Sequence, residues 1–274
     1  MPSSVLAPVW MERHLGRSSY VNVVAIFGGT HGNETCGVSL AEHYLTNGPN
    51  SGCHRDTFTT LTHLMNTKAI EQNTRYCDVD LNRCFLSTDV NVLNTGKEAG
   101  GVYPLPPSTA PHVYEHTLAA QLNTFFGPKQ SPNPNVDYVI DLHNTTANTG
   151  VLMIFHPHDL FSHMVARRVL EYCTANGIEH VRCSNWTAEE PPYAASIGRS
   201  GMTFEVGPVS WGVVDMALVT KTKRLVEVVL DVIEEHNRGC CSSSSGGARE
   251  PASTGTAEEG SKREEYTLTT FQKV

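Results

Sequence analysis

The sequence lacks three features that would place it in a specialised class of protein. It has no excess of positive charge, since its formal net charge is −8 at pH 7, which argues against a broad surface for nucleic acid or anionic lipid. It has no run of the roughly 20 apolar residues that a membrane-spanning helix needs. Residues 1–20 show no basic segment before an apolar core, so we expect a cytosolic protein. Peripheral membrane association stays open.

Cysteine pairs of the CxxC type are also absent, although the chain has eight cysteines. That spacing is typical of zinc and redox motifs. We therefore expect reduced thiols rather than a disulfide framework. With 274 residues, of which 39% are hydrophobic, the chain can bury a sizeable core in one large domain.

Apolar, β-branched runs alternate with helical periodicity along most of the chain. The predicted strands are residues 21–29, 57–66, 136–144, 150–156 and 201–208. The predicted helices are residues 34–46, 111–126, 158–176 and 214–237. Near-continuous apolar strands separated by helices indicate an α/β sandwich, with a mostly parallel or mixed central sheet flanked by helices.

Two stretches fall outside this alternation. Residues 86–110 are rich in Gly, Pro, Ser and Thr, which predicts a long loop. Residues 239–263 have low complexity, which predicts a disordered linker. The expected organisation is an N-terminal extension (1–20), a main domain (21–238), the linker, and a short final segment (264–274).

His31 and Glu34 lie in the glycine-rich turn GGTHGNE, directly after the first apolar run. Loops that leave the carboxyl ends of strands are where α/β folds place ligand-binding groups. The two residues are either a pair of metal ligands or a surface histidine beside a glutamate that favours the start of the next helix. A motif of this length occurs often by chance, so the pair alone does not decide.

A third metal ligand is needed, because a catalytic zinc usually takes three protein ligands and keeps one position for water. The segment DYVIDLHNTT supplies His143 at the polar end of another apolar strand. This histidine could instead be satisfied by the hydroxyls of the following turn. The combination of His31, Glu34 and His143 favours a metal site. Asp141, on the same strand face as His143, is a candidate partner for its ring.

Arg75, Asp80, Asn82 and Arg83 are grouped in the segment TRYCDVDLNRCF. Arginine forks bind carboxylates through two hydrogen bonds, and a neighbouring amide can complete a pocket for an anion. Surface salt bridging is the alternative for such a cluster.

Glu205 lies inside the otherwise apolar segment MTFEVGP. A buried carboxylate is costly without a partner, so this residue needs either a partner or a chemical task. Near a metal-activated water it would be a general base. A buried salt bridge with Arg199 is the structural alternative.

In matching order, the segments GGTHGNE, RYCDVDLNR, DLHNTT and FEVGP resemble those of the aspartoacylase and succinylglutamate desuccinylase family. These zinc amidohydrolases are related to the zinc carboxypeptidases, and the resemblance covers about residues 20–238. It implies that the main domain is catalytic, binds one Zn²⁺, and hydrolyses N-acyl amino acids to a carboxylate and a free amino acid.

Roles for individual residues follow from the same resemblance. The implied zinc ligands are His31, Glu34 and His143, and the implied catalytic residues are Glu205 as the base and Arg75 as the group that polarises the scissile carbonyl. Asn82, Arg83 and Asn144 are assigned to substrate binding.

The sequence departs from the family at two places. Members that prefer N-acetylaspartate carry an arginine ten residues before the base, where this chain has Ala195; we therefore lean toward the sister branch, which acts on N-acyl aromatic amino acids. Family members also continue into a β-rich C-terminal domain, of which residues 264–274 resemble only the opening strand. The alternatives are a catalytically impaired zinc-binding form, a carboxypeptidase-like peptidase and a purely structural α/β domain. Homo-oligomerisation is left open.

Overall fold

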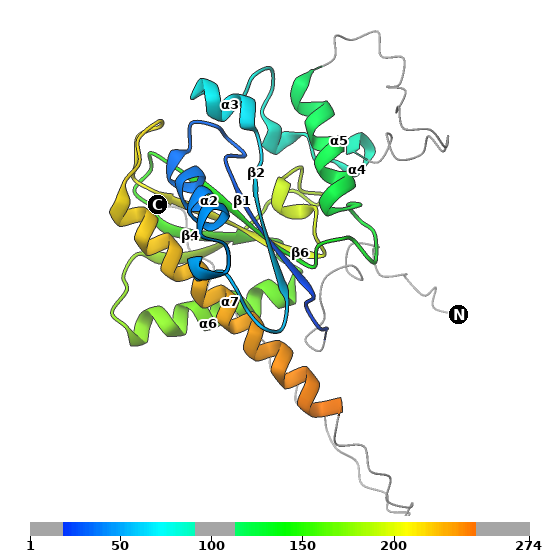
Figure 1. Cartoon of the computed structure of the whole chain (residues 1–274), viewed down its shortest axis with the longest axis vertical. Coiled ribbons are helices and arrows are strands. Elements are labelled where there is room, and N and C mark those ends of the chain that lie inside the picture. The colour runs from blue at the N-terminus through cyan, green and yellow to red at the C-terminus, as the bar shows by residue number, and fades with distance from the viewer. Residues whose placement is uncertain (1–18, 91–112, 245–274) are drawn as a thin grey trace, which may run out of the picture.

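A six-stranded sheet forms the centre of the molecule (Figure 1). The computed structural model describes residues 19–90 and 113–244. The strands, in chain order, are β1 (Val23–Gly28), β2 (Thr59–Leu64), β3 (Tyr138–Asn144), β4 (Gly150–Phe155), β5 (Val181–Asn185) and β6 (Ser200–Gly207). Their spatial order is β2-β1-β3-β6-β4-β5.

The sheet is mixed, as the sequence predicts. Strand β1 pairs in parallel with β2 and β3, and β3 pairs in parallel with β6. Strand β4 runs antiparallel to β6 and parallel to β5. The carboxyl ends of β1, β3 and β6 therefore meet at one edge of the sheet, which is where open α/β sheets bind ligands.

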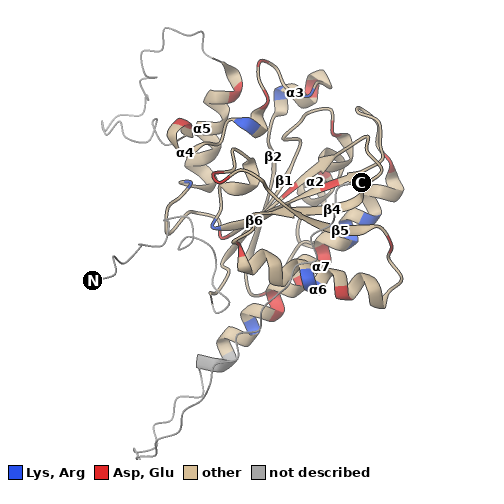
Figure 2. Ribbon diagram, turned by 180° about the vertical axis from the view of Figure 1, so that it is seen from behind, with Lys and Arg blue, Asp and Glu red and all other residues tan. Residues whose placement is uncertain are grey.

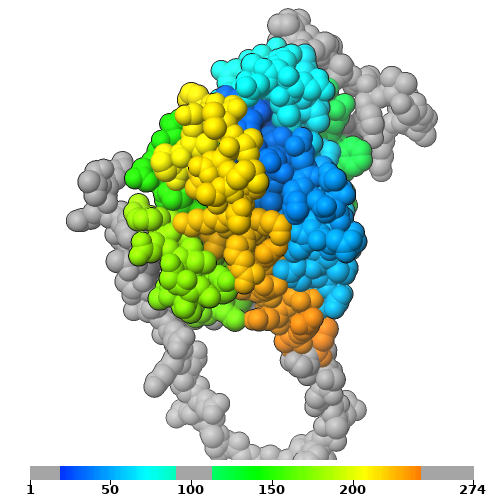
Figure 3. Space-filling view, turned by 60° about the vertical axis from the view of Figure 1, so that its left-hand side comes forward, coloured from blue at the N-terminus to red at the C-terminus, as the bar shows by residue number. Residues whose placement is uncertain are grey.

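Helices cover both faces of the sheet. They are α2 (Thr35–Asn47), α3 (Thr67–Gln72), α4 (Ser87–Val90), α5 (Tyr114–Phe126), α6 (Leu160–Ala175) and α7 (Met216–Ser244), with 3₁₀ turns η1 (Gly48–Ser51), η2 (Leu81–Arg83) and η4 (Ala194–Ser196). Helices α2, α6 and α7 cover one face, and α7 packs between the other two (Figure 3). Helix α5, η2 and η4 contribute to the opposite face.

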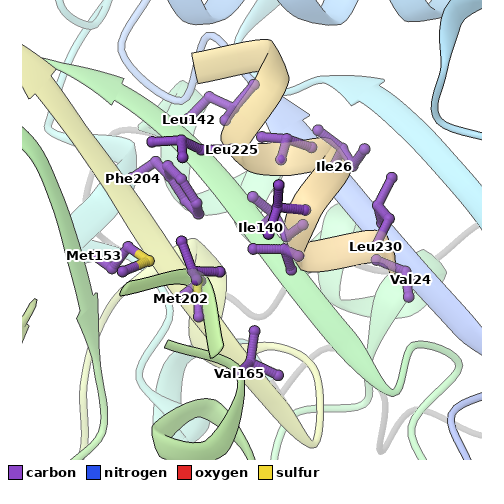
Figure 4. Close-up of a cluster of buried hydrophobic side chains, with 14 of the residues drawn as sticks. Val24, Ile26, Ile140, Leu142, Met153, Val165, Met202, Phe204, Leu225 and Leu230 are labelled. Atoms are coloured by element: carbon purple, nitrogen blue, oxygen red, sulfur yellow. The ribbon is translucent and has the colours of Figure 1, made fainter. Parts of the chain in front are cut away.

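The alternation of side chains across the strands decides which residues meet each layer. Ile140 and Leu142 of β3 and Phe204 of β6 are buried against the layer that contains Leu225 of α7 (Figure 4). Because side chains in a strand alternate, the residues adjacent to these in sequence point to the opposite face, toward α5. Among these is Val139 of β3, which packs in the second core cluster.

The structure confirms all five predicted strands and all four predicted helices, with shifts of a few residues at their ends. It adds β5, α3 and α4, the last of which lies within the predicted loop 86–110. Helix α7 continues to Ser244, so residues 239–244 are helical rather than disordered. The remainder of the predicted linker and the final segment lie outside the described residues.

Charges of both signs are interspersed along α6 and α7 in the view from behind (Figure 2). Arg168 of α6 forms an ion pair with Glu235 of α7, with a separation of 2.7 Å between nitrogen and oxygen. Across residues 19–90 and 113–244, no helix has both the length and the apolar character that crossing a membrane would require.

Candidate metal centre

Three buried side chains converge at the shared edge of β1, β3 and β6. His31 lies in the loop after β1, Glu34 immediately precedes α2, and His143 is near the end of β3. Their candidate ligand atoms lie within 4.8 Å of one another. The sequence motifs meet here because parallel strands deliver their carboxyl ends to the same place.

Glu34 joins the two histidines. Its Oε1 lies 2.6 Å from His31 Nδ1, and its Oε2 lies 2.9 Å from His143 Nδ1. The two Nδ1 atoms are 3.2 Å apart. One nitrogen of each ring and both oxygens of one carboxylate thus face a common point.

The other nitrogen of each ring is held by an aspartate. His31 Nε2 lies 2.8 Å from Asp80 Oδ1, and His143 Nε2 lies 2.7 Å from Asp141 Oδ2. A carboxylate only accepts hydrogen bonds, so these contacts favour a proton on each Nε2. In neutral rings both Nδ1 atoms then carry lone pairs that face each other and Glu34. This donor set repels itself unless a cation lies among the four atoms, so the residues suit a metal ion.

The surrounding charges act on the titration of these groups. Burial disfavours the charged form of Glu34, but His143 and His31 outweigh it and hold the pKa of Glu34 well below its ordinary value. Burial also disfavours a charged His143, but Asp141 and Glu34 raise the pKa of this ring well above its ordinary value. The site therefore attracts positive charge strongly, whether a proton or a metal supplies it.

Glu205 lies directly opposite His143 in the register of β3 and β6. Burial raises the pKa of Glu205, although His143 acts in the other direction. Within the described parts of the chain, no hydrogen bond or ion pair engages its carboxylate. The predicted alternative of a salt bridge to Arg199 is wrong. Arg199 precedes β6, about 20 Å away along an extended strand, and donates to Asp137 at 3.4 Å.

Arg75 reaches the metal centre from the loop after α3. Its Nη1 donates to Glu34 Oε1 at 3.2 Å, and its Nη2 donates to Asp80 Oδ2 at 3.0 Å. The backbone N–H of Gly32 donates to the carbonyl of Arg75 at 3.2 Å, which fixes this loop against the turn that carries His31. The sequence analysis assigns no role to Asp80, but its contact with His31 Nε2 shows that it orients this ring.

Asn82 and Arg83, in η2, lie beside the centre. Asn82 is buried; its Nδ2 lies 3.5 Å from His143 Nε2, and its Oδ1 accepts from the N–H of Ala194 at 2.8 Å. Arg83 is exposed, and its guanidinium lies 5.3 Å from the ring centroid of Tyr193. Its Nη1 donates to the carbonyl of Asn82 at 2.8 Å. In the described ranges Arg83 forms no ion pair with a carboxylate, so the rest of its guanidinium can receive an anion.

Asn144, which the sequence analysis assigns to substrate binding, contacts the start of α2. Its buried side-chain oxygen accepts from the N–H of Cys36 at 3.0 Å and from the N–H of Gly37 at 3.4 Å, at the start of α2. Its own N–H donates to Glu34 Oε2 at 2.9 Å. These contacts orient Glu34 and the start of α2 through the side-chain oxygen and the backbone N–H of Asn144. Its role in substrate binding stays a prediction.

The sequence pattern of the succinylglutamate desuccinylase/aspartoacylase catalytic domain matches residues 20–233. The chain belongs to this family. His31, Glu34 and His143 all fall within the matched region, and so does Glu205.

Individual relatives agree with the family match. The aspartoacylase of Rattus norvegicus is 35% identical, over 80% of this chain and 65% of its own length. The human N-acyl-aromatic-L-amino acid amidohydrolase (carboxylate-forming) is 37% identical, over 79% of this chain and 62% of its own length. The crystal structure of murine aminoacylase 3 superimposes with a TM-score of 0.67 at 32% identity, covering 80% of this chain and 67% of that one. The chain thus spans just under two thirds of the length of these curated relatives.

Proposed function

We propose that the chain carries the catalytic part of a zinc amidohydrolase that cleaves N-acyl amino acids into a carboxylate and a free amino acid. The observation that carries this proposal is the convergence of His31, Glu34 and His143 at the strand edge where Glu205 also lies. Membership of the family supports the reaction class.

Zinc suits this donor set better than magnesium or calcium, because imidazole nitrogen is a poor ligand for the latter two. The two Nδ1 atoms are 3.2 Å apart and each lies within hydrogen-bonding distance of a Glu34 oxygen, so these three residues would hold the ion together. A zinc ion held by His31, Glu34 and His143 supplies Lewis acidity, which polarises an amide carbonyl and makes water more acidic.

Residues of the chain transfer the proton, stabilise the developing charge and orient the metal ligands. Glu205 accepts the proton of the attacking water and returns it to the leaving nitrogen; its raised pKa makes it a stronger base than an ordinary glutamate. Arg75 stabilises the negative charge that develops on the carbonyl oxygen. Asp80 and Asp141 hold the two imidazoles in place.

The substrate side of the site favours one carboxylate and an aromatic side chain. Arg83 offers its guanidinium to the carboxylate of the amino acid, and the ring of Tyr193 lies 5.3 Å from that guanidinium. The buried Trp186 packs against Tyr193, with ring centroids 5.5 Å apart. A second cation is missing at the position where members that prefer N-acetylaspartate have one, because Ala195 is buried there and Arg199 is paired with Asp137. We therefore propose N-acyl aromatic amino acids as substrates.

The test combines metal content with hydrolysis by the purified 274-residue chain, using N-acetylphenylalanine and N-acetylaspartate. We expect one zinc per chain, faster hydrolysis of the aromatic substrate, and a loss of about 10²–10⁴-fold in turnover for Glu205→Ala without loss of zinc. Glu235→Ala, on the exposed side of α7, is the control. Zinc without turnover would indicate the catalytically impaired form. Absence of zinc from the folded chain would overturn the proposal.

A further inference from the structure

Glu115, in the first turn of α5, is a fully buried carboxylate outside the metal centre. Its Oε1 accepts from the N–H of Cys77 at 2.6 Å, and its Oε2 accepts from the N–H groups of Asp78 at 3.0 Å and Val79 at 3.2 Å. Within the described residues, no lysine, arginine or histidine forms an ion pair with it. A charge buried in this way persists only where several donors compensate it.

The contacts between α5 and this loop run in both directions. The N–H of Tyr114 donates to Asp78 Oδ2 at 2.8 Å, while Glu115 accepts from the loop backbone. Asn66 adds a further link, since its Nδ2 donates to Glu115 Oε1 at 3.1 Å and its N–H donates to the carbonyl of Gly29 at 3.1 Å. Glu115 thus joins α5 both to the loop and, through Asn66, to the end of β1.

The loop held by Glu115 has a site residue on each side. Arg75 lies two residues before Cys77 and contacts Glu34, and Asp80 directly follows Val79 and contacts His31. The loop is only partly covered by apolar side chains, because Asp78 is exposed and Val79 is half-buried against the second core cluster. Its position therefore depends on the packing of Val79 and on its hydrogen bonds, of which Glu115 accepts three from consecutive backbone N–H groups.

We propose that Glu115 is a positioning residue that sets Arg75 and Asp80 against the His31–Glu34–His143 cluster. It forms no hydrogen bond with His31, Glu34 or His143, and it acts through the backbone of residues 77–79. This inference rests on the proposed zinc site for its functional consequence, but the placement of the loop by Glu115 does not require a metal.

Asp159 provides a matched control. It is also a buried carboxylate, and it accepts from the N–H and hydroxyl of Ser162 and from the hydroxyl of Ser200 at 3.0, 2.7 and 2.9 Å. It lies at the amino end of β6, the opposite end from Glu205. Replacing either acid with its amide should weaken the fold, but only Glu115 holds a loop whose neighbouring residues, Arg75 and Asp80, contact the metal centre.

The first measurement is the zinc dissociation constant, obtained by competition with a chromogenic chelator. We expect Glu115→Gln to raise it about tenfold, whereas Asp159→Asn leaves it unchanged at a comparable loss of melting temperature. The effect of Glu115→Gln should be non-additive with that of Asp80→Asn, because both act through Asp80. Equal losses of zinc affinity in Glu115→Gln and Asp159→Asn, or full additivity with Asp80→Asn, would overturn the proposal.

The second measurement needs no metal and separates this inference from the proposed function. In the metal-free chain we expect amide hydrogen exchange in residues 77–79 to be about tenfold faster in Glu115→Gln, the equivalent of one hydrogen bond, and unchanged in Asp159→Asn. If Glu115→Gln does not fold, Glu115→Asp, which keeps the charge but shortens the reach, should speed the same amides. Exchange as slow as in the wild type would contradict the role of Glu115. Failure of the wild type to bind zinc would instead contradict the proposed function.

Discussion

Replacing Glu205 with glutamine should stabilise the metal-free chain at neutral and alkaline pH. Burial raises the pKa of Glu205 in the folded state, so its charged form is disfavoured there. The resulting penalty is absent below the ordinary pKa of a glutamate and fully present above the raised pKa. Glutamine has the same shape and never ionises, so it removes this penalty at pH 8 and changes little in acid.

The expected size follows from the environment of the carboxylate. A buried polar group without a partner costs about 1–3 kcal/mol, and Glu205 is only partly buried. We therefore expect a gain of about 1 kcal/mol in the free energy of unfolding, or about 2–4 °C in melting temperature for a domain of this size.

Calorimetry in the presence of a chelator, between pH 5 and pH 8, measures this gain directly. Glu235→Gln is the control, because Glu235 is 58% exposed and paired with Arg168; it should produce no gain. A melting temperature for Glu205→Gln at or below that of the wild type at pH 8 would refute the reasoning, as would a difference that does not change with pH. The confirmed result would show that the fold gives up stability to keep a carboxylate at the catalytic position.

Two further predictions concern the neighbouring residues. Arg83→Ala should raise the KM for N-acyl amino acids about 10–100-fold with a smaller change in kcat, because a charge-assisted hydrogen bond to the substrate carboxylate stabilises the ground state and the transition state alike. Steady-state kinetics measures both constants, with the exposed Arg167→Ala as control. A fall in kcat with no change in KM would contradict this prediction. Asn144→Ala should lower the free energy of unfolding by about 1–2 kcal/mol, the value of a helix N-terminal cap. Urea denaturation measures that loss, and an unchanged midpoint would show that the bonds to Cys36 and Gly37 do not stabilise α2.

The fold class follows from the sequence because the central strands are buried on both faces. Strand β3 is buried at every position, so it appears as an apolar run, interrupted by Asp141, that ends in polar residues. Strand β5 escapes prediction because its five residues, VRCSN, include a single β-branched residue. Strand β2 also lies at an edge of the sheet, but its sequence TTLTHL is rich in β-branched threonine. Helix α3 has only six residues, too few to establish a helical period.

The candidate metal ligands are predictable for a related reason. Each of them follows or ends an apolar strand, and parallel strands bring such positions together. The partners of these ligands are not predictable in the same way. Asp80 and His31 are 49 positions apart, and their contact depends on how the loop after α3 folds back. The opposite mistake occurs with Arg199. It is close to Glu205 in sequence, but the extended strand between them keeps the two side chains apart.

Glu34 and His143 are 109 positions apart in sequence, and this separation affects how metal binding would stabilise the folded chain. An ion held by both would act as a removable cross-link between the first third and the middle of the chain, present in the folded state and lost on unfolding. The free energy of unfolding would then rise by about 1.4 kcal/mol for every tenfold increase in free metal above the dissociation constant. Metal scarcity would therefore reduce the amount of the protein through unfolding and degradation, in addition to any loss of its chemistry.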